Sequence, residues 1–499
     1  MTIQQPSHWI QVLVTYALRE GLAEELDRPV LTNSLHGILD IAPPPAPPAD
    51  GNEMEAIYGL LDHLRQTGHP WGHLSPEACT GRIMSILTPS NSHVARTFRE
   101  QLEDNGPEAA TQWFYRFSGA TKDVRLDLAS RDLRWITQTI YGDLQISVNR
   151  SKPEKDPRDI AAPKSETGYP RCLLCPENAG FWSQPGHPER SNHRIVPLNL
   201  GGEPWFFQYS PYVYYHQHCI VFSKKHRPMV ISPETVVRIL DFLDIFPHFF
   251  LGSNAALPIV GGSILDHDHF QGGCWDFPIQ KATVRRSWTT GNTTVEALHW
   301  PLTTIRLRTD DRSEMEALAS VIIQTWQAYE DRESGIIPTS TKDGHIVRHN
   351  SLSIIGRKAQ DAYEMDLALR NNRINEDHPH GVFHIRPERH HIKKENIGLM
   401  EVMGLAILPG RLLPGLEPIR AALMGCHDKL PPESPHTLWG QKLVKEHGHN
   451  LTEDQANSVL RQEIGTVFLK ALQDCGVYED NAPGWRHLDR FVDKILKGL

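Results

Sequence analysis

The segment Gly261–Gly273, GGSILDHDHFQGG, carries the residue pattern with the clearest chemistry. If it runs as a strand, the two-residue period places His267, His269 and Gln271 on one face. Imidazole can act as a nucleophile or a metal ligand, and an amide can donate hydrogen bonds to phosphoryl oxygens. Backbone N–H groups beside glycines can approach a phosphate closely. The pattern favours a phosphate-handling site, and the alternative is an exposed strand end whose histidines face water.

A second pattern is the pair Cys172 and Cys175, at C-x-x-C spacing. Two thiolates at this spacing can share one tetrahedral zinc ion, which needs two further ligands. His226, after an expected strand, and His267 could complete a Cys-Cys-His-His set. The surrounding sequence lacks the βαβ setting of a thioredoxin-like redox motif. The alternative is a pair of reduced cysteines in a turn.

Hydrophobic periodicity predicts the strands that must position these residues. Residues 141–149 alternate apolar and polar side chains, which is typical of a strand. Residues 205–215 and 219–223 are aromatic and β-branched, which also favours strands. The apolar run at 257–265, LPIVGGSIL, predicts a buried strand directly before the histidines.

Helices accompany these strands. One is predicted to begin at Ser232 with Pro233 in its first turn. Another follows a strand at 303–308, where Ser313 and Glu316 have capping-box spacing. Strands and helices thus recur in α+β fashion.

Composition excludes several classes of protein. The 499 residues carry a net charge of −9, without the basic balance of a nucleic-acid-binding protein. No apolar run approaches the ~20 residues of a membrane-spanning helix, and the N-terminus lacks the features of a signal peptide. Seven cysteines are sparse and odd in number, which predicts a reducing cytoplasmic location rather than a disulfide framework.

These motifs together resemble the galactose-1-phosphate uridylyltransferase family, the nucleotidyl-transferring branch of the histidine-triad superfamily. The resemblance rests on H-x-H-x-Q behind Gly-Gly-Ser, on C-x-x-C-P-E-N upstream and on F-S-x-x-H between them, and it is closest to class II. It implies two histidine-triad-like halves, each a mostly antiparallel sheet with helices, after an all-α N-terminal extension. We expect the extension at 1–140, the first half at 141–285 and the second half at 286–499.

The resemblance implies transfer of UMP from UDP-glucose to galactose 1-phosphate, by a ping-pong reaction through a uridylyl group on His269. Gln271 would hold the transferring phosphoryl oxygens. Ser263 and the backbone of Gly261 and Gly262 would add further donors to the same oxygens.

Other site residues follow from the same resemblance. Asn254 would position the nucleophile or a phosphate, and Glu401 would contact sugar hydroxyls. Tyr209, with Phe207 and Tyr212, would lie near the uracil and ribose. For these aromatic residues, core packing is an equally weighted alternative.

The resemblance also implies a structural zinc site closed by four protein ligands, which are Cys172, Cys175, His226 and His267. A second metal, present in first-class relatives, stays open because an expected H-x-H ligand pair reads Val382-Phe383-His384 here. Nearby histidines that could substitute are His378, His380, His390 and His391. The implied partners are UDP-glucose or UDP-galactose, hexose 1-phosphates and a second copy of the chain, with no nucleic acid and no membrane.

Other functions remain open at this point. A histidine-triad nucleotide phosphorylase or hydrolase would send phosphate or water to the His269 intermediate, although Gln271 in place of a third histidine argues against the hydrolase. N-acetylhexosamine 1-phosphates are alternative acceptors. A non-enzymatic zinc-stabilised scaffold or nucleotide sensor would not need His269.

Overall fold

The computed structural model describes residues 5–42, 45–149, 168–184, 187–262, 264–426 and 430–498. Their contacts divide the chain into two compact units. As far as they are described, residues 1–126, 165–213 and 217–226 form the first unit, and residues 127–164, 214–216 and 227–499 form the second. This division differs from the three expected segments, because the helical extension shares a unit with strands of the first half.

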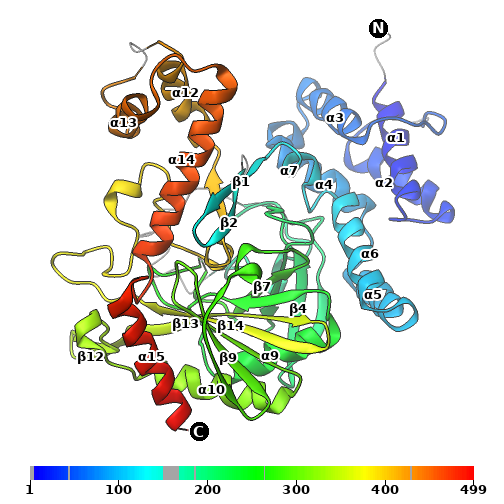
Figure 1. The fold of residues 1–499 in the computed structure, drawn as a ribbon. Coiled ribbons are helices and arrows are strands. Elements are labelled where there is room, and N and C mark those ends of the chain that lie inside the picture. The colour runs from blue at the N-terminus through cyan, green and yellow to red at the C-terminus, as the bar shows by residue number, and fades with distance from the viewer. Residues whose placement is uncertain are drawn as a thin grey trace. The chain divides into compact units, whose positions relative to one another are not determined.

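Helices make up the leading part of the first unit (Figure 1). They are α1 (Pro6–Arg19), α2 (Arg28–Ile38), α3 (Glu53–Thr67), α4 (Pro76–Leu87), α5 (Asn91–Asn105) and α6 (Pro107–Ala120), and the short α7 (Leu126–Ala129) follows. Local sequence explains where they begin. The Asn52 side chain accepts from Met54 N and Glu55 N at the start of α3, and Ser75 accepts from Ala78 N at the start of α4.

The first unit also contains the antiparallel strands β3 (Val196–Leu200), β4 (Glu203–Tyr209) and β5 (Cys219–Ser223). Aromatic side chains from α5, α6 and β4 form one core. The ring centroids of Phe114 and Phe207 lie 5.5 Å apart, and those of Phe98 and Phe114 lie 5.8 Å apart. The helical extension is therefore part of the same folded body as these strands.

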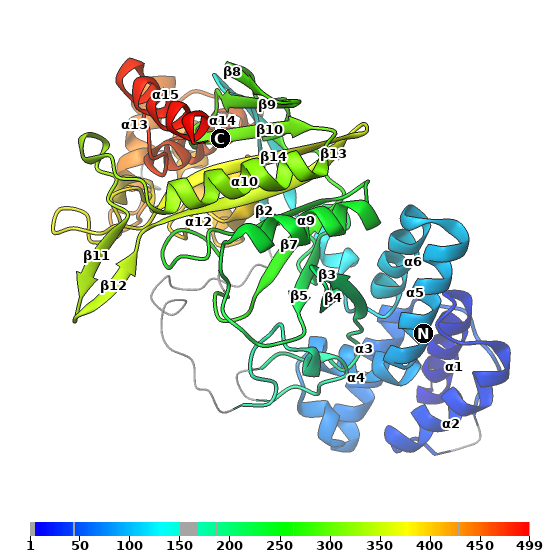
Figure 2. The same cartoon turned by 90° about the horizontal axis from the view of Figure 1, so that it is seen from below.

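The second unit is built on a large sheet. Its neighbouring strands are β7 (His269–Gly273), β6 (Phe250–Ser253), β13 (Asn350–Ala359), β14 (Ala362–Asn371), β10 (Thr304–Thr309), β9 (Thr293–Leu298) and β8 (Val284–Thr290). Each of these neighbouring pairs is antiparallel. Helices α9 (Pro233–Ile245) and α10 (Arg312–Gln327) lie side by side over one face of it (Figure 2). The other face is left for the segments that carry the site.

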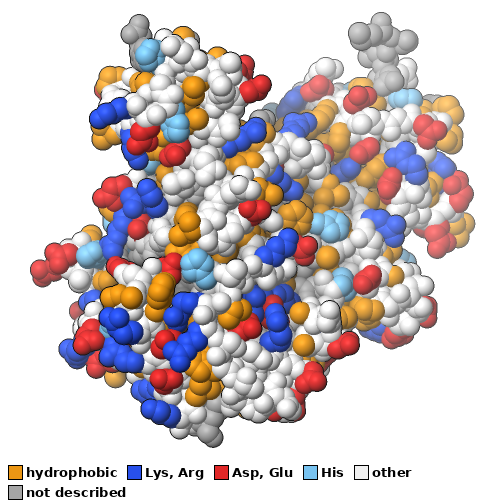
Figure 3. Space-filling model, in the orientation of Figure 1, with side chains coloured by type: hydrophobic (Ala, Val, Ile, Leu, Met, Phe, Trp, Pro, Cys, Tyr) orange, Lys and Arg blue, Asp and Glu red, His pale blue; other side chains and the backbone are white. Residues whose placement is uncertain are grey.

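A smaller sheet in the second unit joins β1 (Leu133–Thr139), β2 (Gly142–Asn149) and β15 (Leu405–Pro409), with β15 parallel to β2. The hairpin β11 (Thr339–Lys342) and β12 (His345–Arg348) stands apart from both sheets. The remaining helices are α11 (Leu399–Val402), α12 (Leu412–Leu423), α13 (Thr437–His447), α14 (Glu453–Asp474) and α15 (Ala482–Lys497). Acidic and basic side chains are interspersed over the face drawn in Figure 3.

The structure confirms several predicted elements. The strands expected at 141–149, 219–223 and 303–308 are β2, β5 and β10, and the helix expected at Ser232 is α9. The strand expected at 205–215 is confirmed only in part, since β4 ends at Tyr209. Helix α10 exists, but its N-cap is Asp311 rather than Ser313.

The prediction of a buried strand at 257–265 is wrong. Within this segment, Ile259 and Gly262 have φ angles of 60° and 78°, which an extended strand cannot contain. The described residues of this segment form turns and bends instead. The apolar side chains made the segment look like a strand, although it is an irregular connection between β6 and β7.

Candidate active site and metal group

Strand β7 presents His269 and Gln271 on one face. They are two residues apart, so the side chain between them, Phe270, points the opposite way and is buried at 2% exposure. The Tyr215 hydroxyl donates to the Gly272 carbonyl at 3.1 Å and ties down the end of the strand. The predicted pair of side chains is thus brought together by a short, anchored strand.

One hydrogen bond settles the tautomer of His269. Its Nδ1 lies 2.8 Å from the His267 carbonyl oxygen. A carbonyl oxygen can only accept, so Nδ1 carries the proton and Nε2 keeps its lone pair. Burial lowers the pKa of His269 to about 4, so the ring is neutral at neutral pH. A neutral imidazole with an available Nε2 can attack an electrophile.

Asn254 lies beside this strand. The register pairs Phe250 with Gly273 and Gly252 with Gln271, and Asn254 follows directly after β6. The Asn254 Oδ1 and Gln271 Oε1 atoms are buried and have no hydrogen-bond partner within the described chain. Buried polar groups in proteins are nearly always paired, so two unpaired amide oxygens here indicate a place for a polar ligand.

Glycines close in on Asn254. A Cβ added at Gly261 would lie 3.2 Å from Asn254 Oδ1, and one at Gly398 would lie 3.7 Å from the same atom. Gly262 has a φ of 78° and would also meet the Asn254 side chain. Gly261 is a buried residue, and its N–H donates no hydrogen bond among the described residues. A buried free N–H can serve an anionic ligand.

We call Gly261, Gly262 and Gly398, the glycines that lie around Asn254, the glycine wall. Glu401 lies in α11, which begins directly after Gly398. Its Oε2 accepts from Gly398 N at 3.0 Å, and its Oε1 accepts from Lys393 Nζ at 3.0 Å. Both Glu401 and Lys393 are buried, at 7% and 1% exposure. The Gly398 contact places Glu401 near Asn254, while the roles expected for these residues stay predictions. Ser263 lies outside the described residues.

The four predicted metal ligands Cys172, Cys175, His226 and His267 form a group that could hold a metal ion. The Cys172 and Cys175 sulfurs are 3.6 Å apart, and His226 Nδ1 is 3.2 Å from Cys175 Sγ. Around a tetrahedral zinc ion, two sulfur ligands lie roughly 3.7 Å apart and a sulfur and a nitrogen ligand roughly 3.5 Å apart. The sulfur pair matches its distance, the sulfur–nitrogen pair is about 0.3 Å closer, and the donor types are those that zinc prefers. Asn178 braces the turn, since its Nδ2 donates to the carbonyls of both cysteines at 2.8 Å.

The second-metal histidines do not form such a group. Among the described residues, the other set that could hold a metal is Asp331, Glu333 and His487, where Arg490 already pairs with Glu333 at 3.1 Å. His384 Nε2 lies instead 3.2 Å from Asn396 Oδ1. We therefore assign no second metal.

Tyr209 is placed in the core of the first unit rather than in an open pocket. It is 1% exposed, and its hydroxyl donates to the Thr111 carbonyl at 2.7 Å. Phe207 is fully buried against Phe114. This placement favours core packing, the alternative reading of these aromatic residues, and Tyr212 is only partly buried.

Sequence reasoning missed two arginines. Arg227, the residue after His226, donates to Asp268 Oδ2 at 3.2 Å, and its carbonyl accepts from Asp268 N at 2.7 Å. Arg370 on β14 is buried at 2% exposure and donates to the backbone beside Gly261. The sequence of β14 contains Glu364 and Asp366 as well as Arg370, so it offered no signal that singles out Arg370.

Comparison with known proteins agrees with these observations. The family model described as galactose-1-phosphate uridyl transferase, N-terminal domain, matches residues 65–228, and the C-terminal domain model matches 242–424. Galactose-1-phosphate uridylyltransferase of Caldanaerobacter subterraneus subsp. tengcongensis is 42% identical, over 99% of this chain and 98% of its own length. The Bacillus subtilis protein of the same name is 40% identical, over 97% of both chains.

A solved structure, that of yeast Ap4A phosphorylase Apa2, aligns with 71% of this chain and 92% of its own at 11% identity and a TM-score of 0.32. That similarity is too low to bear on fold or activity.

These matches define the chain as an enzyme of the nucleotidyltransferase class, which removes the non-enzymatic scaffold from the alternatives. The chain belongs to the galactose-1-phosphate uridylyltransferase family. No described helix is long and apolar enough to cross a membrane.

Proposed function

We propose that this chain transfers UMP from UDP-glucose to galactose 1-phosphate through a uridylyl group on His269. The observation that carries the proposal is the Nδ1 bond of His269, which leaves Nε2 as the nucleophilic atom on a strand flanked by unpaired polar groups. The names of the relatives support the choice of substrates.

In the first step, Nε2 of His269 attacks the α-phosphorus of UDP-glucose. The bond between that phosphorus and the oxygen bridging to the β-phosphate breaks, and glucose 1-phosphate leaves with the electron pair. In the second step, a phosphate oxygen of galactose 1-phosphate attacks the same phosphorus and the P–N bond breaks. UDP-galactose and free imidazole result, so atoms and charge balance over the cycle.

Neither step requires a general acid. The second pKa of a phosphate monoester is about 6, so a sugar phosphate can depart without a proton. Gln271 would then act through its amide, which can rotate to present N–H donors to the phosphoryl oxygens. The free N–H of Gly261 would donate to the same group.

Zinc would be held by Cys172, Cys175, His226 and His267. A site with four protein ligands is closed, so the metal would stabilise the fold around the approach to β7 and take no part in the transfer. We expect one zinc ion per chain and its loss in Cys175→Ser. The exposed Cys426 serves as the control, since Cys426→Ser should keep the metal.

The test is isotope exchange in the absence of galactose 1-phosphate. A ping-pong enzyme exchanges labelled glucose 1-phosphate into UDP-glucose, because the first step is reversible on its own. No exchange, in a chain that still makes UDP-galactose, would exclude the intermediate.

The same preparation distinguishes the remaining alternatives. Sustained UMP release from UDP-glucose alone would indicate a hydrolase, and UDP released by inorganic phosphate would indicate a phosphorylase. A panel of hexose 1-phosphates, N-acetylated ones included, defines the acceptor. The resemblance also implies a dimer, which stays a prediction. Light scattering would test it by measuring the mass of the particle in solution.

A further inference from the structure

Arg370 bridges the two segments that carry the glycine wall. Its Nη2 donates to the Val260 carbonyl at 2.6 Å, and its Nη1 donates to the Ile397 carbonyl at 3.2 Å. Gly261 and Gly398 are the residues that follow those carbonyls. One rigid guanidinium on β14 therefore holds both peptide units that border Asn254.

The geometry of the peptide bond gives this bridge a consequence. In a trans peptide the C=O and the following N–H point in opposite directions. The peptide between Val260 and Gly261 points its carbonyl at Arg370. Its N–H, which belongs to Gly261, therefore points away from Arg370. The N–H of the peptide between Ile397 and Gly398 likewise points away from Arg370. This N–H donates to Glu401 Oε2 at 3.0 Å.

These bonds also polarise the two peptides. A hydrogen bond to a carbonyl strengthens the donor character of the N–H in the same unit, because hydrogen bonds in chains reinforce one another. The Gly261 N–H has no acceptor of its own in the described chain, so the reinforced donor is available to a ligand. Arg370 is only 2% exposed, so its bonds to the Val260 and Ile397 carbonyls are shielded from water.

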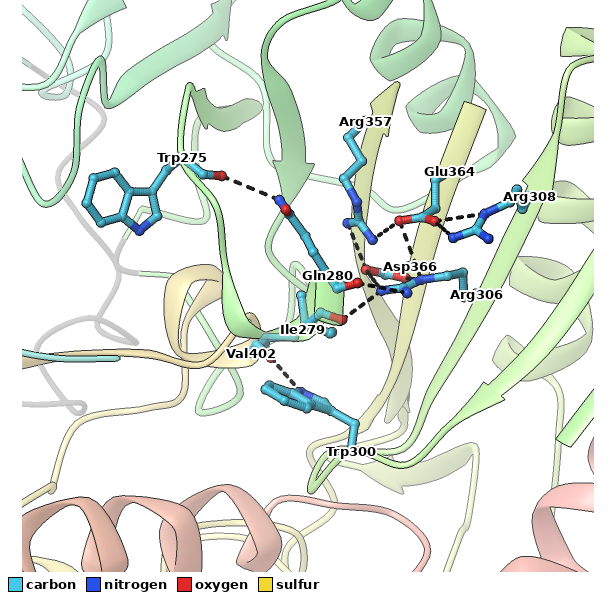
Figure 4. Close-up of polar contacts among 10 residues, drawn as sticks. All are labelled: Trp275, Ile279, Gln280, Trp300, Arg306, Arg308, Arg357, Glu364, Asp366 and Val402. Carbon is cyan, nitrogen blue, oxygen red and sulfur yellow. Dashed lines mark hydrogen bonds and ion pairs between the residues drawn. The ribbon is translucent and has the colours of Figure 1, made fainter. Parts of the chain in front are cut away.

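A second buried arginine in the same unit makes a useful contrast. Arg306 on β10 donates to the Ile279 carbonyl at 2.8 Å, but it also pairs with Asp366 at 2.6 Å (Figure 4). Arg357 shares that carboxylate at 2.8 Å. Arg370 pairs with no carboxylate among the described residues. Both arginines clamp backbone carbonyls, and only Arg370 clamps those beside the site.

We propose that Arg370 is a positioning residue for UMP transfer. Through Val260 it aims the Gly261 N–H at one non-bridging oxygen of the α-phosphate, and through Ile397 it holds the Gly398 contact that fixes Glu401. The inference rests on the proposed function, since it assigns the Gly261 N–H to the phosphorus attacked by His269.

The test uses the two diastereomers of UDP-glucose that carry sulfur in place of one α-phosphate oxygen. If the Gly261 N–H donates to only one of the two non-bridging oxygens of the α-phosphate, the full chain reacts with the two diastereomers at different rates. In Arg370→Met and Arg370→Lys we expect kcat with UDP-glucose to fall by about 10²-fold and the diastereomer rate ratio to fall towards one. Lysine keeps the charge but lacks the planar fork that spans two carbonyls.

The matched control is Arg306→Lys. It removes a buried guanidinium bonded to a carbonyl and lowers the unfolding temperature, and we expect it to leave the diastereomer ratio unchanged. A merely structural role for Arg370 would lower the folded fraction without moving the ratio. If Arg370→Met does not fold, Arg370→Lys carries the test.

Three results would overturn the inference: an unchanged ratio in a folded Arg370 variant, an equal change in Arg306→Lys, or a parent chain without diastereomer preference. If the parent chain transfers no UMP at all, the proposed function fails instead, so the two failures are distinguishable.

Discussion

The two units bury different arrangements of charged groups. In the first unit, Phe114 and Phe207 pack in an aromatic core, and the buried His193 ring lies 2.7 Å from Asp123 and 2.9 Å from Gln208. In the second unit, Arg306, Asp366 and Arg370 are buried at 2% exposure or less. Aromatic burial stabilises without further conditions, whereas each buried charge costs free energy unless it is bonded. The arginines buried at 2% exposure, Arg306 and Arg370, thus lie in the unit that carries His269.

The largest effect expected from this comparison is on catalysis in the second unit. His269→Ala should lower kcat by at least about 10⁴-fold, because no other group can form the covalent intermediate. Thermal unfolding should change little, since the ring makes a single hydrogen bond to the described part of the chain, at the His267 carbonyl. Steady-state assays with UDP-glucose and galactose 1-phosphate measure kcat. Residual activity near that of the parent chain would refute the role of His269.

The first unit should show the opposite behaviour. Phe114→Ala removes a fully buried ring from the centre of the aromatic core and should cost about 3–5 kcal/mol of unfolding free energy. Chemical denaturation measures the loss. The kcat of the folded fraction should be unchanged, and a specific loss of kcat would break the contrast between the units.

The charged interior predicts a smaller loss with a pH signature. Asp366→Asn leaves Arg306 and Arg357 without their shared carboxylate and should cost about 3 kcal/mol at pH 7. Burial raises the pKa of Asp366, but Arg357 and Arg306 outweigh it and hold that pKa below its ordinary value.

The stabilisation by Asp366 is therefore present above the unfolded pKa of about 3.9, and it is lost as the pH falls through the lower folded pKa. Denaturation curves of the parent chain and the variant should converge at acid pH. If they stay equally separated there, the ion pair is not the source of the difference.

Tyr209→Phe gives the smallest effect and sharpens the comparison most finely. It removes one buried hydrogen bond, to Thr111, and should cost about 1 kcal/mol of stability. The KM for UDP-glucose should stay the same, because the structure places this ring in the core. A raised KM with unchanged stability would return Tyr209 to the substrate pocket.

Spacing alone predicted part of the local geometry. The two-residue period placed His269 and Gln271 on one face of β7, although the strand begins at His269 and does not include His267, and the C-x-x-C pair lies with His226 and His267 as expected. These features are local or follow from residue types with few other uses. Asn254 was proposed through family resemblance, and it follows directly after β6, the strand that pairs with β7.

What the sequence could not predict depends on tertiary contacts. The segment at 257–265 has the composition of a buried strand, but positive φ angles at Ile259 and Gly262 wrap it around Asn254. Arg370 lies in a strand that carries other charged residues, and its contacts are with carbonyls far along the chain. The sequence alone does not distinguish a tyrosine that stacks on a base from one that packs against Phe114, as Tyr209 does.

The central claim is that His269 carries the uridylyl group. Its most direct test is to mix the full chain with UDP-glucose labelled in the α-phosphate, denature it at alkaline pH, where a phosphoramidate persists, and map the labelled peptide. The account predicts label on His269, released as UDP-galactose when galactose 1-phosphate is added before denaturation. Label on another residue, or rapid transfer with no labelled protein at any time, would contradict it.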